Sequence, residues 1–265
     1  MPNAPINGID LYYETYGEGD EAFVFAHGAG GNHMSWWNQV PAFAERGRVV
    51  TFDHRAFGQS LDTSGAGSAA FVDDLAGLLN HLGIPRATLI AQSMGGRSAM
   101  GFTLRHPERV KALVMADTVL GIRELVVAAM DEAAREQMEE TRRQRAAANA
   151  PTNTWALGPT YRQRNPAGAF LYQQIADLNP PRDPSFLAGG EPPVTKEQLA
   201  ALTVPILWLV GEDDALMPPA MMRAAHHLTP SSRLLVVPEC GHSVYFEAPQ
   251  AFNAAVMDFL GITTG

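Results

Sequence analysis

The stretch Ala91-Gln92-Ser93-Met94-Gly95-Gly96 joins an apolar run over residues 87–92, which predicts a buried strand, to a helical pattern over residues 94–105. A serine at such a sharp strand-to-helix turn has a strained backbone and an exposed hydroxyl. Small residues must flank it, because the strand and the helix approach closely. Gly95 meets this requirement, and Ala91 stands where glycine is commoner. The stretch predicts a nucleophile turn of an α/β sheet, and the alternative is a serine that only caps a helix.

Short β-rich runs recur on both sides of this turn, and most of them are followed by a helical pattern. Their near-continuous apolar character is typical of parallel strands that helices cover on both faces. The alternation therefore predicts an open, doubly wound α/β sheet. The expected strands are residues 11–15 (in an edge hairpin at Asn7-Gly8), 23–27, 48–53, 87–92, 110–116, 205–211 and 233–238, and the expected helices are residues 35–44, 70–82, 94–105, 219–227 and 249–260.

The alternation of strands and helices stops between residues 118 and 202, where no strand pattern occurs. Residues 123–148 form a charged, weakly amphipathic helical stretch with opposite charges at helical spacing, such as Glu139 with Arg143. Asn165-Pro166 begins a further helix, because it joins a capping residue to a proline suited to the first turn. We expect a helical cap, residues 121–199, inserted into a core of residues 1–120 and 200–265.

Composition narrows the class of protein. A chain of 265 residues with 46% hydrophobic and 18% charged residues suits a globular core and excludes a disordered chain, a coiled coil or a collagen-like fibre. A net charge of −9 argues against nucleic acid and anionic membranes as partners. The single cysteine, Cys240, forms no internal disulfide, residues 1–10 show no secretory signal, and the apolar run over residues 204–210 is too short for a membrane span. We expect a cytoplasmic protein that acts on a small-molecule substrate, in an oligomeric state that the sequence leaves unknown.

Three more segments with reactive side chains or flexible backbone lie just past predicted strands. Ligand sites of open α/β sheets gather at the carboxyl ends of the strands, so these segments should meet the serine turn. The chain order Ser, Asp, His matches the order described for the serine elbow of α/β-hydrolases and differs from that of the two main serine protease folds. The segments are His27-Gly28-Ala29-Gly30-Gly31, Gly211-Glu212-Asp213-Asp214 and Gly241-His242-Ser243.

On these motifs the chain resembles the α/β-hydrolase superfamily. The resemblance runs over nearly the whole sequence and includes Asp53-His54-Arg55-Ala56-Phe57-Gly58 and Phe246-Glu247-Ala248-Pro249, with Ala56 standing where the family usually has glycine. It implies an eight-stranded, mostly parallel sheet with the cap over the site. Within the superfamily, the Ser-Met-Gly-Gly turn and residues 113–118 are most similar to small esterases and enol-lactone hydrolases.

The resemblance also implies a role for each motif. Ser93 would be the nucleophile, His242 its base and Asp214 the acid that orients the base. Backbone N–H groups of Ala29 and Met94 would form the oxyanion hole. The family spacing favours Asp214 over Asp213, and Asp117, after the strand at 110–116, is a further possible acid. This chemistry implies no metal, flavin or nucleotide cofactor.

Aromatic residues supply the candidates for substrate binding, and we select Trp36, Trp155 and Tyr161. Their spacing does not separate a pocket from a packed core: Trp36 and Trp37 are neighbours, so one should be core and the other could line the entrance. Trp155 and Tyr161 lie in the expected cap, where core packing is the alternative. Other aromatic residues of the cap share this ambiguity, namely Phe170 and Tyr172.

The function that best fits these residues is a serine hydrolase that cleaves a carboxylic ester or lactone of a small, largely apolar substrate through an acyl-enzyme. A carbon–carbon bond hydrolase of meta-cleavage type is the alternative. That group usually has asparagine before the serine and tryptophan after the histidine, where this chain has Gln92 and Ser243. A non-catalytic binding module and a cofactor-independent oxygenase also stay open. A dinucleotide site is excluded, because the third glycine of its fingerprint would fall at His33, and no cluster has zinc spacing.

Overall fold

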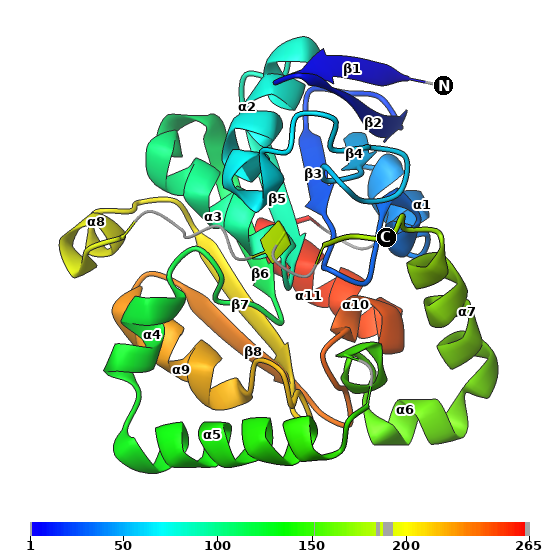
Figure 1. Ribbon diagram of the computed structural model, residues 1–265. Coiled ribbons are helices and arrows are strands. Elements are labelled where there is room, and N and C mark those ends of the chain that lie inside the picture. The colour runs from blue at the N-terminus through cyan, green and yellow to red at the C-terminus, as the bar shows by residue number, and fades with distance from the viewer. Residues whose placement is uncertain (1, 151, 184–185, 188–192, 263–265) are drawn as a thin grey trace.

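The computed structural model describes residues 2–150, 152–183, 186–187 and 193–262. Within these residues the strands form one eight-stranded sheet in the order β1-β2-β4-β3-β5-β6-β7-β8 (Figure 1). The β1–β2 and β2–β4 pairs are antiparallel and all other pairs are parallel, which confirms the predicted mostly parallel sheet. The strands are β1 Asn3–Ile6, β2 Ile9–Tyr16, β3 Ala22–Ala26, β4 Arg48–Phe52, β5 Ala87–Gln92, β6 Val110–Ala116, β7 Ile206–Gly211 and β8 Arg233–Val237.

The central strands send alternate side chains to two separate hydrophobic clusters, one on each face of the sheet. In β3, Val24 belongs to one cluster and Phe25 to the other. In β7, Trp208 and Leu209 divide in the same way. Because both faces are buried, the strands read as continuous apolar runs rather than as alternating ones.

Helices cover both faces of this sheet, as the strand pattern predicts. Helices α2 (Phe71–His81), α3 (Gly95–Arg105) and α9 (Pro219–Leu228) pack into the cluster that contains Val24. Helices α1 (Val40–Ala44) and α11 (Pro249–Leu260) pack into the cluster that contains Phe25. The short α10 (Val244–Glu247) precedes α11, and three 3₁₀ turns complete this part: η1 (His33–Trp36), η2 (Gly67–Ala70) and η3 (Pro107–Arg109).

The helix expected over residues 35–44 is wrong in its extent. The chain forms η1 and then α1, which begins only at Val40 with Pro41 in its first turn. Proline fits a first turn but has no N–H for a helix interior, so it marks a new helix rather than the middle of a longer one.

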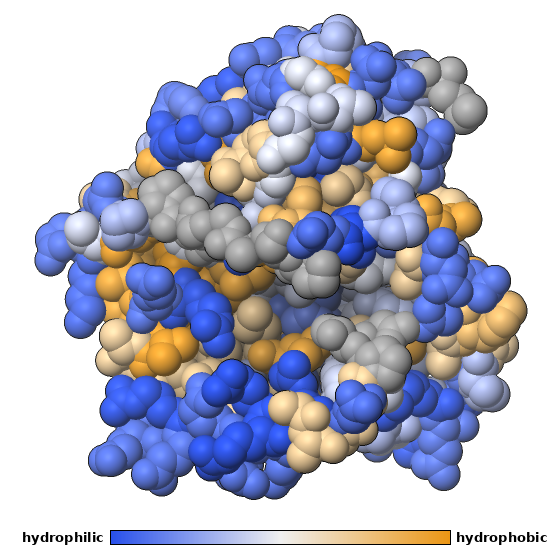
Figure 2. Space-filling view, viewed as in Figure 1, coloured by the Kyte–Doolittle hydropathy of each residue, from blue (hydrophilic) through white to orange (hydrophobic). Residues whose placement is uncertain are grey.

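Between β6 and β7 the described residues form helices and no strand. The expected helix over 123–148 is broken after Ala129, because Asp131 caps a new helix by accepting the N–H of Ala134 at 2.7 Å. The expected pair of Glu139 with Arg143 is also wrong, since Glu139 pairs with Arg142. Figure 2 shows hydrophilic surface where α5 runs along this face of the molecule. We call these helices the insertion: α4 Arg123–Ala129, α5 Glu132–Ala147, η4 Thr152–Trp155, α6 Pro159–Arg164, α7 Pro166–Asp177 and α8 Lys196–Ala200.

Candidate active site

Ser93 occupies the turn between β5 and α3 with a φ of 47°, in the left-handed region that non-glycine residues seldom adopt. Such a conformation costs about 1–3 kcal/mol and persists only where its surroundings hold it. The Ser93 N–H donates to the carbonyl of Ala116 at 3.1 Å, and the Gly96 N–H donates to the carbonyl of Ser93 at 2.9 Å. The strained turn expected from the sequence is therefore present and fixed at both ends.

Two glycines let the backbone close around this turn. A Cβ on Gly95 would lie 2.1 Å from the carbonyl oxygen of Ala26 in β3, so only glycine lets α3 start this close to the sheet. A Cβ on Gly28 would lie 2.0 Å from Gln92 Oε1 and 3.1 Å from Ser93 Cβ. The glycine-rich loop after β3 therefore lies directly against the serine.

The structure brings Ser93, His242 and Asp214 together in one hydrogen-bonded chain. Ser93 Oγ and His242 Nε2 are 2.8 Å apart, and His242 Nδ1 and Asp214 Oδ2 are 2.8 Å apart. A carboxylate can only accept, so Nδ1 carries the proton and the lone pair of Nε2 faces the serine hydroxyl. The second carboxylate oxygen of Asp214 accepts the N–H groups of Leu216 and Met217 at 2.8 and 2.9 Å, which fixes its plane.

The proton affinity of His242 is set by opposing effects. Burial of the ring disfavours its charged form and lowers the pKa. The negative charge of Asp214 and its hydrogen bond to the ring, together with the charges of Asp117 and Glu247, outweigh the effect of burial, so the pKa of His242 is raised above its ordinary value. The imidazole is thus suited to hold a proton that it receives from the serine.

Of the three carboxylates considered from the sequence, Asp214 is the one in contact with His242. Asp213 is exposed. Asp117 is fully buried at the end of β6 and accepts the N–H of Gly211 at 3.0 Å and that of Val244 at 3.2 Å. Burial, and then the nearby charge of Asp214, raise the pKa of Asp117 well above its ordinary value. Asp117 holds the backbone on both sides of the Asp214–His242 pair.

Glu247 is a residue of the site that sequence reasoning missed. One of its carboxylate oxygens accepts the N–H of Gly241 at 3.0 Å and that of Gly158, in the insertion, also at 3.0 Å. The other oxygen accepts the N–H of Ser243 at 3.2 Å. The N–H groups of both residues next to His242, Gly241 and Ser243, therefore donate to one carboxylate. The only available signal was its position in the Phe246-Glu247-Ala248-Pro249 motif.

Of the oxyanion candidates, Met94 follows Ser93 in the chain and Ala29 follows Gly28, whose added Cβ would lie 3.1 Å from Ser93 Cβ. Met94 directly precedes α3, where the first backbone N–H groups have no partner within the helix. Ala29 follows Gly28 in the loop that contacts the serine. His27 fixes that loop: its Nδ1 donates to the carbonyl of Gly28 at 2.8 Å and its Nε2 accepts the N–H of His54 at 3.0 Å. Complete burial lowers the pKa of His27 to about 4, so the ring is neutral and structural.

The three aromatic residues selected for substrate binding occupy different environments. Trp36 has no exposed surface and packs between Phe25 and Tyr245, with ring centroids 5.0 and 4.6 Å away, so it is a core residue and not, as expected, one that binds substrate. Its neighbour Trp37 is the exposed one of the pair. Trp155, at the end of η4, and Tyr161, in α6, are half-buried in the insertion.

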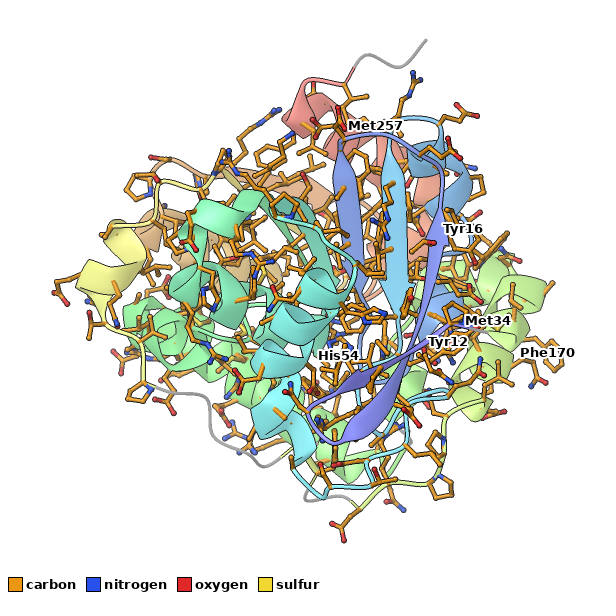
Figure 3. The ribbon with its side chains drawn as sticks, turned by 90° about the horizontal axis from the view of Figure 1, so that it is seen from above. Tyr12, Tyr16, Met34, His54, Phe170 and Met257 are labelled. Carbon is orange, nitrogen blue, oxygen red and sulfur yellow. The ribbon has the colours of Figure 1, made fainter. Side chains whose placement is uncertain are left out.

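Tyr172, on α7, reaches closer to the site than those residues. Its hydroxyl accepts a hydrogen bond from Ser243 Oγ at 3.2 Å, next to His242, and lies 3.5 Å from where a Cβ of Gly30 would be. Figure 3 shows Phe170 of the same helix projecting outward. The sequence contains both aromatic residues two positions apart, but helical spacing does not show which of them faces the sheet.

The described residues contain no group of three or more His, Cys, Asp or Glu side chains arranged to hold a metal ion. None of their helices is both long enough and apolar enough to cross a membrane.

Comparison with known proteins finds relatives along most of the chain. Residues 21–249 match the model of a protein family described as "alpha/beta hydrolase fold". A 2-hydroxy-6-oxononadienedioate/2-hydroxy-6-oxononatrienedioate hydrolase of Burkholderia vietnamiensis is 31% identical over 273 residues, covering 95% of this chain and 91% of its own. The 3-oxoadipate enol-lactonase 2 of Acinetobacter baylyi is 28% identical, covering 94% of this chain and 92% of its own.

Solved structures show the same likeness. A thermophilic esterase from Thermogutta terrifontis superposes with a TM-score of 0.76 at 29% identity, covering 96% of this chain and 93% of its own. These relatives match 94–96% of the chain, while their names describe different reactions. The similarity therefore extends to the entire fold and leaves the substrate to be argued from the site.

Proposed function

The chain is an enzyme of the α/β-hydrolase family, and on that premise we propose that it is a cytoplasmic serine hydrolase that cleaves a carboxylic ester or lactone of a small, largely apolar substrate through an acyl-enzyme. The observation that carries the proposal is the pair of 2.8 Å contacts from Ser93 to His242 and from His242 to Asp214. Nucleophile, base and orienting acid in hydrogen-bond contact are what covalent acyl transfer requires.

In the proposed reaction Ser93 Oγ attacks the acyl carbonyl while His242 Nε2 takes the hydroxyl proton. Asp214 holds the imidazole in the required tautomer and stabilises its charged form. The N–H groups of Ala29 and Met94 donate to the oxyanion, each contributing about 3–4 kcal/mol to the transition state. His242 returns its proton to the leaving oxygen, and then activates the water that releases the acid and restores Ser93. Every step is an acyl or proton transfer, so the cycle needs no cofactor.

We further propose that the insertion, residues 121–199, acts as the cap of this site. Three contacts support that role. Asn32, in the loop after β3, donates to the carbonyl of Ile175 at 2.8 Å, Tyr172 bonds to Ser243, and Gly158 bonds to Glu247. The contacts join the insertion to the glycine-rich loop after β3, to the residue after His242 and to Glu247 in α10. The cap would then shape the pocket, with Trp155, Tyr161 and Tyr172 as residues that bind the substrate.

Replacing the nucleophile is the direct test. We expect Ser93→Ala to lower kcat on a 4-nitrophenyl ester by about 10⁶-fold and to abolish labelling by a fluorophosphonate probe. Ser231→Ala, at an exposed serine, is the matched control and should keep both properties. Undiminished labelling of the Ser93→Ala protein would show that another residue is the nucleophile.

A carbon–carbon bond hydrolase is a second candidate, favoured by the 31% identity to the dienedioate hydrolase. It would use the same three residues on a vinylogous diketone. The two reactions separate in one assay, by comparing loss of the absorbance of a ring-fission product with release of 4-nitrophenol. Faster turnover of the diketone would replace the ester proposal, and turnover of neither substrate would contradict both.

A further inference from the structure

Helix α7 has apolar side chains both on the side that faces the core and on the side that faces away from it. Tyr172 and Ile175 are buried. On the outward side, Phe170 is 66%, Leu178 56% and Leu171 37% exposed. A surface helix normally presents polar residues to water, and a helix that is apolar all round is normally buried. The outward side of α7 therefore has the composition of a contact surface.

This apolar surface continues onto the neighbouring η1 turn. Asn32, which caps η1, bonds to Ile175 of α7 at 2.8 Å, so the two elements lie side by side. Figure 3 shows Met34 and Phe170 on the same side of the molecule, and Figure 2 shows hydrophobic atoms at the right-hand edge, where α7 runs in Figure 1. Among the described residues eight large hydrophobic side chains are exposed, and five of them form this surface, which we call the α7 face: Met34, Trp37, Phe170, Leu171 and Leu178. A continuous exposed patch, unlike a single exposed residue, marks an interaction site.

The charges at the two ends of α7 point to the partner. Arg162 and Arg164 lie in the last turn of α6, just before α7 begins, and Asp177 is the last residue of α7. The sequence of α7 has no acidic residue in the first turn and no basic residue in the last turn, so the helix does not offset its own dipole. Arg164 is exposed and, beside its bond to Glu239, has N–H groups left for a further carboxylate. A second copy of α7, packed antiparallel, would bring Asp177 of each copy to the arginines of the other.

We propose that the protein forms a homodimer in which the α7 faces of two copies pack against each other about a two-fold axis, with the two α7 helices antiparallel. A two-fold axis requires one patch to contact itself, and the α7 face meets this requirement in charge as well as in hydrophobicity. The net charge of −9 disfavours an anionic membrane as the partner. The proposal does not depend on the reaction at Ser93.

The extent of the α7 face suits such an interface. A stable dimer buries about 800 Å² of each partner, in an apolar core with a polar rim. The 12 residues of α7 span about 18 Å, and Met34 and Trp37 widen the apolar stripe on one side. This surface supplies the core, and Arg164 and Asp177 at the two ends supply part of the rim.

Sedimentation velocity measures the oligomeric state. We expect the wild-type protein to be a dimer at about 50 µM and Leu171→Glu to be a monomer there, with a dissociation constant raised at least about 100-fold. The symmetric interface contains each substitution twice, so two glutamates would enter its apolar core. Leu235→Glu, on β8, is the matched control, because Leu235 is also 37% exposed. That variant should remain a dimer, and circular dichroism should show both variants to be folded.

A new cysteine tests the antiparallel arrangement. Gln174 is exposed and lies between Leu171 and Leu178 on the outward stripe, so the two copies of this residue should meet near the two-fold axis. Gln174→Cys should therefore form a disulfide between subunits under mild oxidation, since the native Cys240 is buried and does not compete. Gln163→Cys, at an exposed position of α6, is the control and should not cross-link, because the antiparallel helices hold the two copies of residue 163 apart.

Three results would overturn the proposal. The first is a wild-type protein that is monomeric at about 50 µM. If that monomer floats with vesicles of phosphatidylcholine and Leu171→Glu does not, the α7 face is a lipid contact instead. The second is a dimer that Leu235→Glu dissociates and Leu171→Glu does not, which would place the interface at the edge strand β8. The third is cross-linking of Gln163→Cys but not of Gln174→Cys, which would exclude the antiparallel arrangement.

Discussion

The carboxyl edge of the sheet and the insertion are built in opposite ways. At the edge, the polar residues that build the site are almost completely buried: Asp117 has no exposed surface, Asp214 is 3% exposed and His242 is 4% exposed. Their backbone and side-chain groups bond to one another, and residues in several turns, among them Ser93 and Asp117, have a positive φ. In the insertion, α5 has no buried residue, and Phe170 on α7 is 66% exposed.

The two regions therefore differ in how strongly the fold constrains the residue type at each position. At the edge, backbones approach so closely that the structure dictates the residue type at each position, and the chemistry follows from those types. The insertion contacts the edge at a few points, such as Asn32 with Ile175 and Glu247 with Gly158. Its surface residues are little constrained by packing. Reaction type should therefore respond sharply to changes at the edge and weakly to changes on the outer helices.

The largest effect is expected where backbones meet. Gly95→Ala would place a methyl group 2.1 Å from the carbonyl oxygen of Ala26, so α3 must move away from β3 and take the Ser93 turn with it. We expect a loss of about 2–3 kcal/mol in the free energy of unfolding and a fall of at least 100-fold in kcat/KM. Urea denaturation and ester hydrolysis measure the two quantities.

Gly101→Ala is the matched control on the same helix. Its methyl group would meet the side chain of Val72, which can shift, rather than backbone. Alanine also favours the helix by about 1 kcal/mol over glycine, so stability and activity should stay near those of the wild type. Equal damage from the two changes would show that the close approach at Gly95 has no special importance.

An intermediate effect is expected at the junction of the two regions. Glu247→Gln keeps one acceptor oxygen but presents an amide NH₂ group to one of the three N–H groups that Glu247 now accepts. The loop that contains His242 should loosen, and we expect kcat/KM to fall about tenfold. Groups facing His242 come from three elements: Asp214 after β7, Asp117 after β6 and Glu247 in α10. Removing the charge of Glu247 lowers the pKa of His242, so the acid limb of the pH–rate profile should move to lower pH.

Glu239→Gln separates this role from general loss of charge. Glu239 lies between β8 and His242. Like Glu247 it contacts the insertion, because it pairs with Arg164, but both of these side chains are exposed. It should leave the acid limb and kcat/KM unchanged. A shift of the acid limb in the Glu239 variant as large as that in the Glu247 variant would contradict a specific role for Glu247.

This contrast explains what could be predicted from the sequence. The strands were recognisable because both faces of the sheet are buried, and the turn at Ser93 because its flanking residues must be small. The rule that sites gather at the carboxyl edge pointed to the segments that contain Asp214 and His242, and the spacing typical of the family favoured Asp214 over Asp213. The sequence wrongly suggested Trp36 as a substrate-binding residue and did not single out Tyr172, because helical spacing does not tell which side of a helix faces the sheet.

Asn32 and Glu247 show a second limit. Their partners are backbone groups of segments far along the chain, such as Ile175 and Gly158. A backbone carbonyl or N–H leaves no mark on residue type, so no pattern in the sequence connects the two partners. Contacts between side chains at one sheet edge can be anticipated from topology, whereas contacts between a side chain and a distant peptide group require the folded structure.

The smallest effect is expected on the outer face of α5. Arg142 pairs with Glu139 three residues earlier, and both side chains are largely exposed to solvent and screened by salt. Arg142→Ala should change the free energy of unfolding by less than about 0.5 kcal/mol, because exposed pairs of this kind stabilise little and alanine favours the helix. Turnover of the 4-nitrophenyl ester should stay at the wild-type rate. A clear loss of activity without a loss of stability would mean that α5 acts on the site, and the division between a constrained edge and a tolerant insertion would then have to be drawn elsewhere.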